Sequence, residues 1–279
     1  MSDILPDMDV AATAHARDLE LGGYAWRERG DGELVVLLHG LGGSRIAWDA
    51  QLASLSDHWR AAAWDMPGYG AADPLPDEPL TFHALAEAAS GWVTLLGAAR
   101  AHVVGISMGG MVAQYLAASH PECVRSLTLL STSPKFAMDG TTAESWRTAR
   151  LAPLDAGSEP VEIAERVLRG IGGPNITEVA LESQRAAMER VTGSALRRSI
   201  ECLVTHDATS LLPTITAPTL VVVGELDQET PPGYSQYLVD HLPHARLFVI
   251  PGAGHLLNAE APEQVNRLLA EHLTTVEAQ

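Results

Sequence analysis

Residues 101–110, Ala101-His-Val-Val-Gly-Ile-Ser-Met-Gly-Gly110, decide the fold of this chain. A short β-branched strand pattern runs into Gly105-Ile-Ser-Met-Gly109, and a helical pattern follows at once. This is the G-x-S-x-G nucleophile elbow in its strand–turn–helix setting. The turn is tight and strained, so the residues two before and two after the serine must be small, and both are glycine. Because the turn lifts the Ser107 hydroxyl above the sheet edge, at the positive end of the following helix, we predict that Ser107 is a nucleophile.

A nucleophilic serine needs a base within hydrogen-bond reach and a third group that orients the base. Around this elbow the partners follow in the order serine, acid, histidine, each just past a strand. The stretch Thr219-Leu-Val-Val-Val-Gly-Glu-Leu-Asp227 is a buried-strand pattern that ends in two acids. The stretch Ala245-Arg-Leu-Phe-Val-Ile-Pro-Gly-Ala-Gly-His255 is a strand pattern followed by a glycine-rich loop. We predict His255 as the base and Asp227 as the acid; Glu225 is the alternative acid, and we expect it to face solvent or to start the turn.

The stretch Glu33-Leu-Val-Val-Leu-Leu-His-Gly-Leu-Gly-Gly43 predicts an oxyanion hole. The tetrahedral intermediate of acyl transfer carries a negative oxygen, which needs preorganised donors. Around this elbow the donors are two backbone N–H groups, one after the nucleophile, at Met108, and one from this loop, at Leu41. Leu41 is assigned by position alone, because side-chain identity does not reveal a backbone donor. We expect His39 to hydrogen-bond the loop into shape rather than to act as a second base.

Strand and helix patterns alternate along the chain, which predicts a mostly parallel sheet covered by helices on both faces. We expect strands at residues 18–21, 24–28, 33–38, 61–64, 102–106, 126–130, 220–223 and 246–250. We expect helices between them at residues 48–54, 81–96, 108–119, 232–241 and 262–274.

Residues 133–212 break this alternation, because they contain no strand pattern, only helical patterns such as those at 159–168, 178–191 and 194–204. We expect a helical cap there, inserted after the sixth strand, which excludes water and shapes the pocket above the nucleophile. The core of the fold would then comprise residues 17–132 and 213–279. Residues 1–16 are expected to form a loose N-terminal arm.

The predicted cap holds nine of the eighteen basic residues of the chain. One or two of them over the site would hold a substrate carboxylate by a bidentate contact, and Arg147 and Arg150 are the candidates. Trp146 is a candidate for lining the pocket, the alternative being packing between cap and core. The other reading of the arginines is that they pair with neighbouring acids in solvent. The nine are Lys135, Arg147, Arg150, Arg166, Arg169, Arg185, Arg190, Arg197 and Arg198.

With these motifs, the chain resembles the α/β-hydrolase superfamily from about Leu19 to its last helix. Trp48, Gln51 and the stretch Asp65-Met-Pro-Gly-Tyr-Gly70 add to the resemblance. It implies an α/β-hydrolase fold, an eight-stranded, mostly parallel sheet with helices on both faces and a helical cap. Haloalkane dehalogenases and epoxide hydrolases of this fold carry an aspartate at the elbow, so Ser107 implies a serine hydrolase instead.

The finer resemblance is to the 3-oxoadipate enol-lactonases. It rests on the stretches Ser107-Met-Gly-Gly-Met-Val-Ala-Gln114, His120-Pro-Glu-Cys-Val-Arg-Ser-Leu127, Trp146-Arg-Thr-Ala-Arg150 and His255-Leu-Leu-Asn-Ala-Glu-Ala-Pro262. The resemblance implies cleavage of an ester or lactone through an acyl-enzyme, with an enol-lactone of aromatic catabolism as substrate. The carboxymethyl arm of that lactone would be the ligand of the cap arginines.

Three other functions stay open. Carbon–carbon bond hydrolases of meta-cleavage products use the same triad, but they tend to have asparagine before the nucleophile and an aromatic residue after the histidine. This chain has Ile106 before the serine, and Leu256 and Leu257 after the histidine. A general carboxylesterase or perhydrolase is the second alternative. The third is a non-catalytic small-molecule receptor or a cofactor-free lyase on the same fold.

The composition of the chain limits which binding partners and cofactors are expected. A chain of 279 residues with 46% hydrophobic content can bury one sizeable core. The formal net charge of −17 argues against a nucleic-acid partner, since phosphate binding needs a basic patch. Cys123 and Cys202 are expected to be small buried hydrophobes rather than disulfide partners. The chain has no C-x-x-C or H-E-x-x-H motif, so neither a metal nor a cofactor is implied.

The N-terminal stretch Met1-Ser-Asp-Ile-Leu-Pro-Asp-Met-Asp-Val10 is acidic and lacks the features of a signal peptide. No apolar run approaches the roughly twenty residues of a membrane-spanning helix. We therefore expect a cytoplasmic protein with a small-molecule substrate and no membrane partner. The sequence leaves open whether it forms a homo-oligomer.

Overall fold

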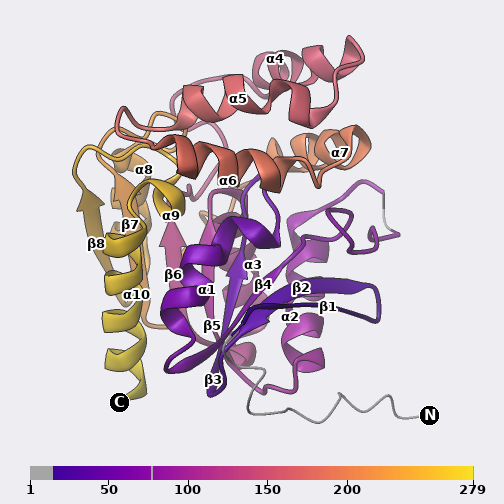
Figure 1. Cartoon of the computed structure of the whole chain (residues 1–279). Coiled ribbons are helices and arrows are strands. Elements are labelled where there is room, and N and C mark those ends of the chain that lie inside the picture. Colours follow the sequence, from indigo (N-terminus) through magenta and orange to yellow (C-terminus); the bar gives the residue numbers. More distant parts are fainter. Residues whose placement is uncertain (1–14, 77, 279) are drawn as a thin grey trace.

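The computed structural model of the chain describes residues 15–76 and 78–278 and contains one eight-stranded sheet (Figure 1). The strand order is β1-β2-β4-β3-β5-β6-β7-β8. The pairs β1–β2 and β2–β4 are antiparallel, and the other five pairs are parallel. All eight predicted strands are present, which confirms the mostly parallel sheet. The strands are β1 (Arg17–Leu21), β2 (Tyr24–Arg29), β3 (Glu33–Leu38), β4 (Trp59–Trp64), β5 (Ala101–Ile106), β6 (Val124–Leu130), β7 (Thr219–Gly224) and β8 (Ala245–Ile250).

Helices cover both faces of the sheet, as expected. Successive residues of β3 alternate between two buried clusters, with Val36 and Leu38 in one and Val35 and Leu37 in the other. Both sides of the strand are therefore buried away from solvent, which explains its unbroken apolar sequence. The first cluster includes α2 (Phe82–Leu95), α3 (Met108–Ser119) and α8 (Pro232–His241), and the second includes α1 (Asp49–Leu55) and α10 (Pro262–Glu277).

Four α-helices lie between β6 and β7, within residues 133–212, and this segment is called the cap below. Figure 1 shows them above the edge of the sheet at which the parallel strands end. Three of them begin after a threonine whose hydroxyl accepts a hydrogen bond from the backbone N–H three residues on, at Thr142, Thr177 and Thr192. Such side chains satisfy one of the free donors of a helix start. The four are α4 (Ala143–Asp155), α5 (Pro160–Ile171), α6 (Glu178–Met188) and α7 (Gly193–Leu203).

Helix α4 has no counterpart among the helices predicted from the sequence. Its single buried residue is Leu151, and it contains Pro153, so it lacks the apolar period that marks a helix. The two ends of the cap segment meet, because the N–H of Phe136 donates to the carbonyl of His206 and the N–H of Ala208 donates to that of Pro134. The chain therefore enters and leaves the cap at one place.

The predicted N-terminal arm, residues 1–16, lies outside the described residues except for the last two. Cys123 and Cys202 are both buried and free, as expected. Among the described residues, none of the helices combines the length and the apolar character needed to cross a membrane.

Candidate active site

Ser107 occupies the turn between β5 and α3 with φ 52° and ψ −121°. This is a sparsely populated conformation for a residue with a side chain, and it persists only where the surroundings impose it. The N–H of Ser107 donates to the carbonyl of Leu130, and its carbonyl accepts from the N–H of Met111 and the hydroxyl of Thr132. Three bonds to the backbone of one residue hold the strained turn in place.

The two glycines of the elbow allow this turn because neither has room for a side chain. A Cβ atom on Gly109 would overlap the carbonyl oxygen of Leu38 in β3, and one on Gly105 would overlap the carbonyl oxygen of Gly109. The elbow therefore packs backbone against backbone, as the spacing in the sequence predicts.

Replacing Gly109 with alanine is expected to lower the free energy of unfolding by about 2 to 4 kcal/mol, since the added methyl group must displace main chain. Urea denaturation followed by circular dichroism measures the loss. The matched control is Gly233→Ala in α8, where a Cβ atom meets nothing within 4 Å. Equal stability of the two variants would contradict the backbone packing described for the elbow.

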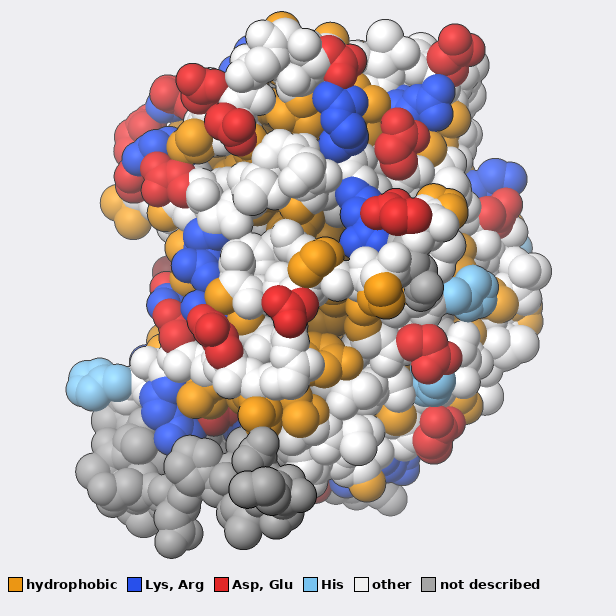
Figure 2. All heavy atoms as spheres, turned by 90° about the vertical axis from the view of Figure 1, so that its right-hand side faces the viewer, with side chains coloured by type: hydrophobic (Ala, Val, Ile, Leu, Met, Phe, Trp, Pro, Cys, Tyr) orange, Lys and Arg blue, Asp and Glu red, His pale blue; other side chains and the backbone are white. Residues whose placement is uncertain are grey.

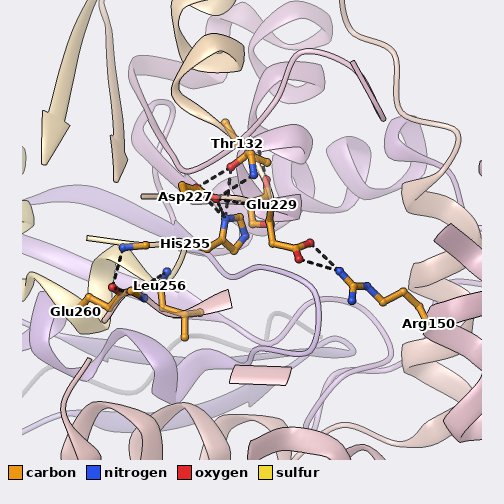
Figure 3. A network of polar contacts seen from close by, with 11 residues as sticks. Thr132, Arg150, Asp227, Glu229, His255, Leu256 and Glu260 are labelled. Carbon is orange, nitrogen blue, oxygen red and sulfur yellow. Dashed lines mark hydrogen bonds and ion pairs between the residues drawn. The ribbon is translucent and has the colours of Figure 1, made fainter. Parts of the chain in front are cut away.

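Asp227 and His255 form a buried pair in the loops after β7 and β8 (Figure 3). The Nδ1 atom of His255 lies 2.9 Å from Oδ2 and 3.0 Å from Oδ1 of Asp227. The Asp227 carboxylate also accepts the N–H groups of Glu229 and Thr230 and the hydroxyl of Thr230. These bonds fix the carboxylate, which in turn orients the imidazole ring.

Electrostatics favour the charged forms of both partners. Burial alone would raise the pKa of Asp227, but His255 and the hydrogen bonds from Thr230 outweigh it, and the pKa is lowered. Burial alone would lower the pKa of His255, but the Asp227 carboxylate, with further contributions from Glu229 and Glu260, raises it above its ordinary value. The pair is thus suited to stabilise an imidazolium.

The alternative acid, Glu225, lies on the exposed side of the same turn. Its carboxylate accepts the N–H of Gly252 at 2.9 Å and so ties the loop after β7 to the loop after β8. Of the two acids after β7, Asp227 is the one that contacts the histidine.

The loop after β3 approaches Ser107 closely, since a Cβ atom on Gly40 would lie 3.1 Å from the Cβ atom of Ser107. His39 shapes this loop, as expected. Its Nε2 atom accepts the N–H of Met66 at 2.9 Å, so the proton is on Nδ1, which donates to the carbonyl of Gly40 at 2.8 Å. Burial lowers the pKa of His39, in keeping with this neutral form.

The two residues predicted to supply the oxyanion donors are Met108, which follows Ser107 directly, and Leu41. Met108 is the first residue of α3, and the first N–H groups of a helix have no acceptor within it. Leu41 lines the same cavity as Ser107. The carbonyl oxygen of a substrate bound at the Ser107 hydroxyl would lie in the part of the cavity next to Met108 and Leu41.

A cavity of about 780 Å³ connects these groups under the cap. Ser107, His255, Leu41 and Trp146 are among the residues that line it. Within the described residues no hydrogen bond joins the Ser107 hydroxyl to His255, and such contacts often tighten only in a substrate complex. The apolar lining from the cap includes Phe136, Trp146, Ile163, Val167, Leu196 and Ile200.

The two candidate arginines differ in placement. Arg147 forms an ion pair with Glu201 at 3.3 Å and is not among the residues that line the cavity, so a contact with substrate loses its geometric basis. Arg150 lines the cavity, and one of its nitrogens contacts both carboxylate oxygens of Glu229, at 2.8 and 2.9 Å (Figure 3). Its guanidinium also stacks 5.1 Å above the ring of Trp146.

Arg166, on α5, is a cavity residue that the sequence argument did not select. Within the described residues it has no ion pair, whereas the other eight basic residues of the cap all have acidic partners. Figure 2 shows basic and acidic side chains next to one another over the upper part of the molecule, where the cap lies. The acid four residues before Arg166, Glu162, is used instead in the capping box with Glu159.

One group of side chains in the described ranges could hold a metal ion, and it lies away from Ser107. Donor atoms of Glu33, His102 and Glu277 lie within 4.8 Å of one another near the starts of β3 and β5. These groups already have protein partners, since Arg125 pairs with Glu33 at 2.9 Å and Ser126 contacts Nδ1 of His102 at 2.7 Å. The cluster has no contact with the cavity.

Comparisons with known proteins agree with this fold. Residues 35–268 match the model of the alpha/beta hydrolase family. A pimeloyl-(acyl-carrier protein) methyl ester esterase of Chromobacterium violaceum is 32% identical over 256 residues, which cover 88% of this chain and 96% of that protein. A thermophilic esterase from Thermogutta terrifontis is 27% identical, with a TM-score of 0.82 and coverage of 94% and 99%. The enol-lactonase from Burkholderia xenovorans is 25% identical, with a TM-score of 0.81 and coverage of 92% and 100%.

Proposed function

The chain belongs to the alpha/beta hydrolase family, and we propose that it is a serine hydrolase that cleaves carboxylic esters and lactones through an acyl-enzyme. The observation that carries the proposal is the convergence of three chain segments on one cavity. Ser107 on its strained turn and His255 with its Asp227 partner come from the ends of β5, β8 and β7. A nucleophile, a base and an orienting acid are the parts that acyl transfer to serine requires.

The chemistry follows from these positions. His255 takes the proton of the Ser107 hydroxyl while the oxygen attacks the ester carbonyl, and Asp227 stabilises the imidazolium that forms. The backbone N–H groups of Met108 and Leu41 donate to the oxyanion of the tetrahedral intermediate. The intermediate collapses and expels the alkoxide or enolate, which receives the proton from His255. Water, deprotonated by the same histidine, then attacks the acyl-enzyme and releases the acid.

Two named relatives support an ester or lactone as substrate. The C. violaceum protein is named for a methyl ester and the B. xenovorans protein for an enol-lactone, which is a cyclic ester. The apolar cap lining fits the acyl part of such substrates, because it removes carbon surface from water. Repeated turnover of p-nitrophenyl acetate, lost in the Ser107→Ala variant, tests the reaction class, whereas a receptor would give at most one slow burst.

Within this class, we propose an enol-lactone with a free carboxylate as the substrate. Two arginines that line the cavity, Arg150 and Arg166, are the candidate ligands of that carboxylate. Arg150 is already neutralised by Glu229, so a substrate carboxylate would have to displace a protein carboxylate of equal charge. Arg166 lines the same cavity without a protein partner among the described residues, which makes it the better carboxylate ligand.

For 3-oxoadipate enol-lactone we expect a kcat/KM above about 10⁵ M⁻¹s⁻¹, which is abolished in Ser107→Ala. Arg166→Ala is expected to raise KM for this anionic lactone by about 10- to 50-fold, because one charge-assisted hydrogen-bonded contact is lost. KM for the neutral p-nitrophenyl acetate should not change. Steady-state kinetics on both substrates give the comparison.

The matched control is Arg169→Ala on the same helix, where the arginine pairs with Glu165 and Glu178 outside the cavity. Equal effects of Arg166→Ala on the charged and the neutral substrate would reject the carboxylate contact. Slow lactone turnover with rapid cleavage of simple esters would retain the serine hydrolase and assign it another ester.

A further inference from the structure

Glu260, at the end of α9 (Leu257–Glu260), holds backbone from two parts of the molecule with one carboxylate (Figure 3). Its Oε1 atom accepts the N–H of Leu256 at 2.8 Å. Its Oε2 atom accepts the N–H groups of Gly254 and Gly173, each at 2.8 Å. Gly254 and Leu256 are the two neighbours of His255, and Gly173 belongs to the cap, between α5 and α6.

The cap loop and the histidine loop touch directly at this point. A Cβ atom on Gly173 would lie 2.6 Å from the backbone nitrogen of Gly254 and 2.5 Å from Oε2 of Glu260. The N–H of His255 itself donates to the carbonyl of Ile171, the last residue of α5, at 3.0 Å. The backbone N–H groups of Gly254, His255 and Leu256 therefore donate to Glu260 or to the cap.

We propose that Glu260 is a positioning residue that sets the place of His255 and couples it to the cap. The inference rests on the proposed function, in which His255 is the base. Backbone N–H groups bind a carboxylate more strongly than a neutral acceptor, and three of them share this one. If the cap loop moves away, the Glu260 carboxylate loses the N–H of Gly173, one of its three donors. The carboxylate is then held less firmly, and so are Gly254 and Leu256, which donate to it. A displacement of about 1 Å in such a group is enough to cost two orders of magnitude in rate.

The charge of Glu260 also reaches the histidine ring. Three carboxylates act on His255, namely Asp227 and Glu229 after β7 and Glu260 on α9, while Arg150 of α4 neutralises Glu229 from the other side. Each carboxylate favours the protonated ring and raises the pKa of His255. Removal of the Glu260 charge should therefore lower that pKa, and an effect on folding alone would not.

The test is Glu260→Gln, which keeps the size of the side chain and removes its charge and one acceptor oxygen. We expect kcat for p-nitrophenyl acetate to fall by about 10- to 100-fold, with KM within about threefold of the parent value. His255 must be neutral to act as a base, so kcat/KM rises as the pH passes its pKa. The low-pH limb of kcat/KM should therefore move to lower pH.

Glu263→Gln is the matched control, because it removes the same charge from an exposed side chain three residues along. It should keep kcat and the position of the limb. Glu260→Gln with the same kinetics as this control would overturn the proposal. A lower kcat with an unmoved limb and an equal loss of thermal stability would also overturn it, since it would indicate a merely structural role.

Gly173→Ala tests the link to the cap and remains informative if Glu260→Gln does not fold. The added methyl group would press the cap loop away from Gly254 and from the Glu260 carboxylate, while Glu260 keeps its negative charge. We expect a lower kcat with an unmoved limb, and an unchanged kcat would refute the coupling. Ser107→Ala is assayed in parallel: turnover equal to the parent would reject the proposed function itself, whereas an inactive blank confines any failure to the role of Glu260.

Discussion

Replacing Ser107 with alanine is expected to lower kcat for ester hydrolysis by about 10⁴ to 10⁶. The variant loses the oxygen that would form the acyl-enzyme, and the remaining groups can only assist a direct attack by water. The hydrogen bonds that hold the turn use the backbone of Ser107, so they survive the substitution. Alanine tolerates the turn no worse than serine does, since both carry a Cβ atom at φ 52°. The protein should therefore stay folded, with an unchanged melting temperature.

Turnover of p-nitrophenyl acetate measures this loss, and thermal unfolding by circular dichroism checks the fold. Ser133→Ala is the matched control, because Ser133 lines the same cavity and the substitution again removes one hydroxyl. We expect that variant to stay within about tenfold of the parent. A loss of less than tenfold in Ser107→Ala would falsify the assignment of Ser107 as the nucleophile.

The parts of the molecule that could be predicted from the sequence are those in which local pattern and physical role coincide. The apolar runs that end at Leu38 and Ile106 predict strands buried on both faces, and the structure has them so. The elbow needs glycine at fixed sequence positions relative to Ser107, so the sequence alone predicts this turn. The order of Asp227 and His255 after two further strands predicts a pair, and the structure brings these two side chains into contact.

The rest depends on contacts between distant segments. Arg150 and Glu229 are 79 residues apart, so no spacing rule could reveal that the guanidinium is already neutralised. Arg166 has an acid one helical turn before it, and only the structure shows that this Glu162 serves the capping box instead. The sequence assigns no role to Glu260, although it lies in the stretch from His255 to Pro262. Its partners are backbone N–H groups, which every residue except proline has, so no residue type identifies them.

Replacing Asp227 with asparagine is the second large effect, with an expected fall in kcat of about 10² to 10⁴. The amide oxygen can still accept the N–H groups of Glu229 and Thr230, so the turn keeps its shape. The NH₂ group then faces Nδ1 of His255 and donates to it, which places the remaining ring proton on Nε2. That tautomer cannot accept the proton of Ser107, and the imidazolium loses the negative charge that stabilises it.

The pH dependence of Asp227→Asn adds a second readout. The Asp227 carboxylate contributes most to the raised pKa of His255, so its neutralisation should lower that pKa. Because the base is active only when it is neutral, the low-pH limb of kcat/KM should shift to lower pH while the maximum falls. Measurements of kcat/KM from pH 4 to pH 9 follow both changes.

Glu225→Gln is the control that separates the two acids after β7. Its carboxylate is exposed, and among the described residues its one hydrogen-bond donor is the N–H of Gly252. An amide oxygen can also accept that N–H, so we expect kcat to stay within about twofold of the parent. The ranking of the two variants depends on one geometric fact, the 2.9 Å contact between Asp227 and Nδ1 of His255. If Glu225→Gln were the inactive variant and Asp227→Asn the active one, the acid of the site would be Glu225, and the loop after β7 would have to turn over to bring it to the histidine.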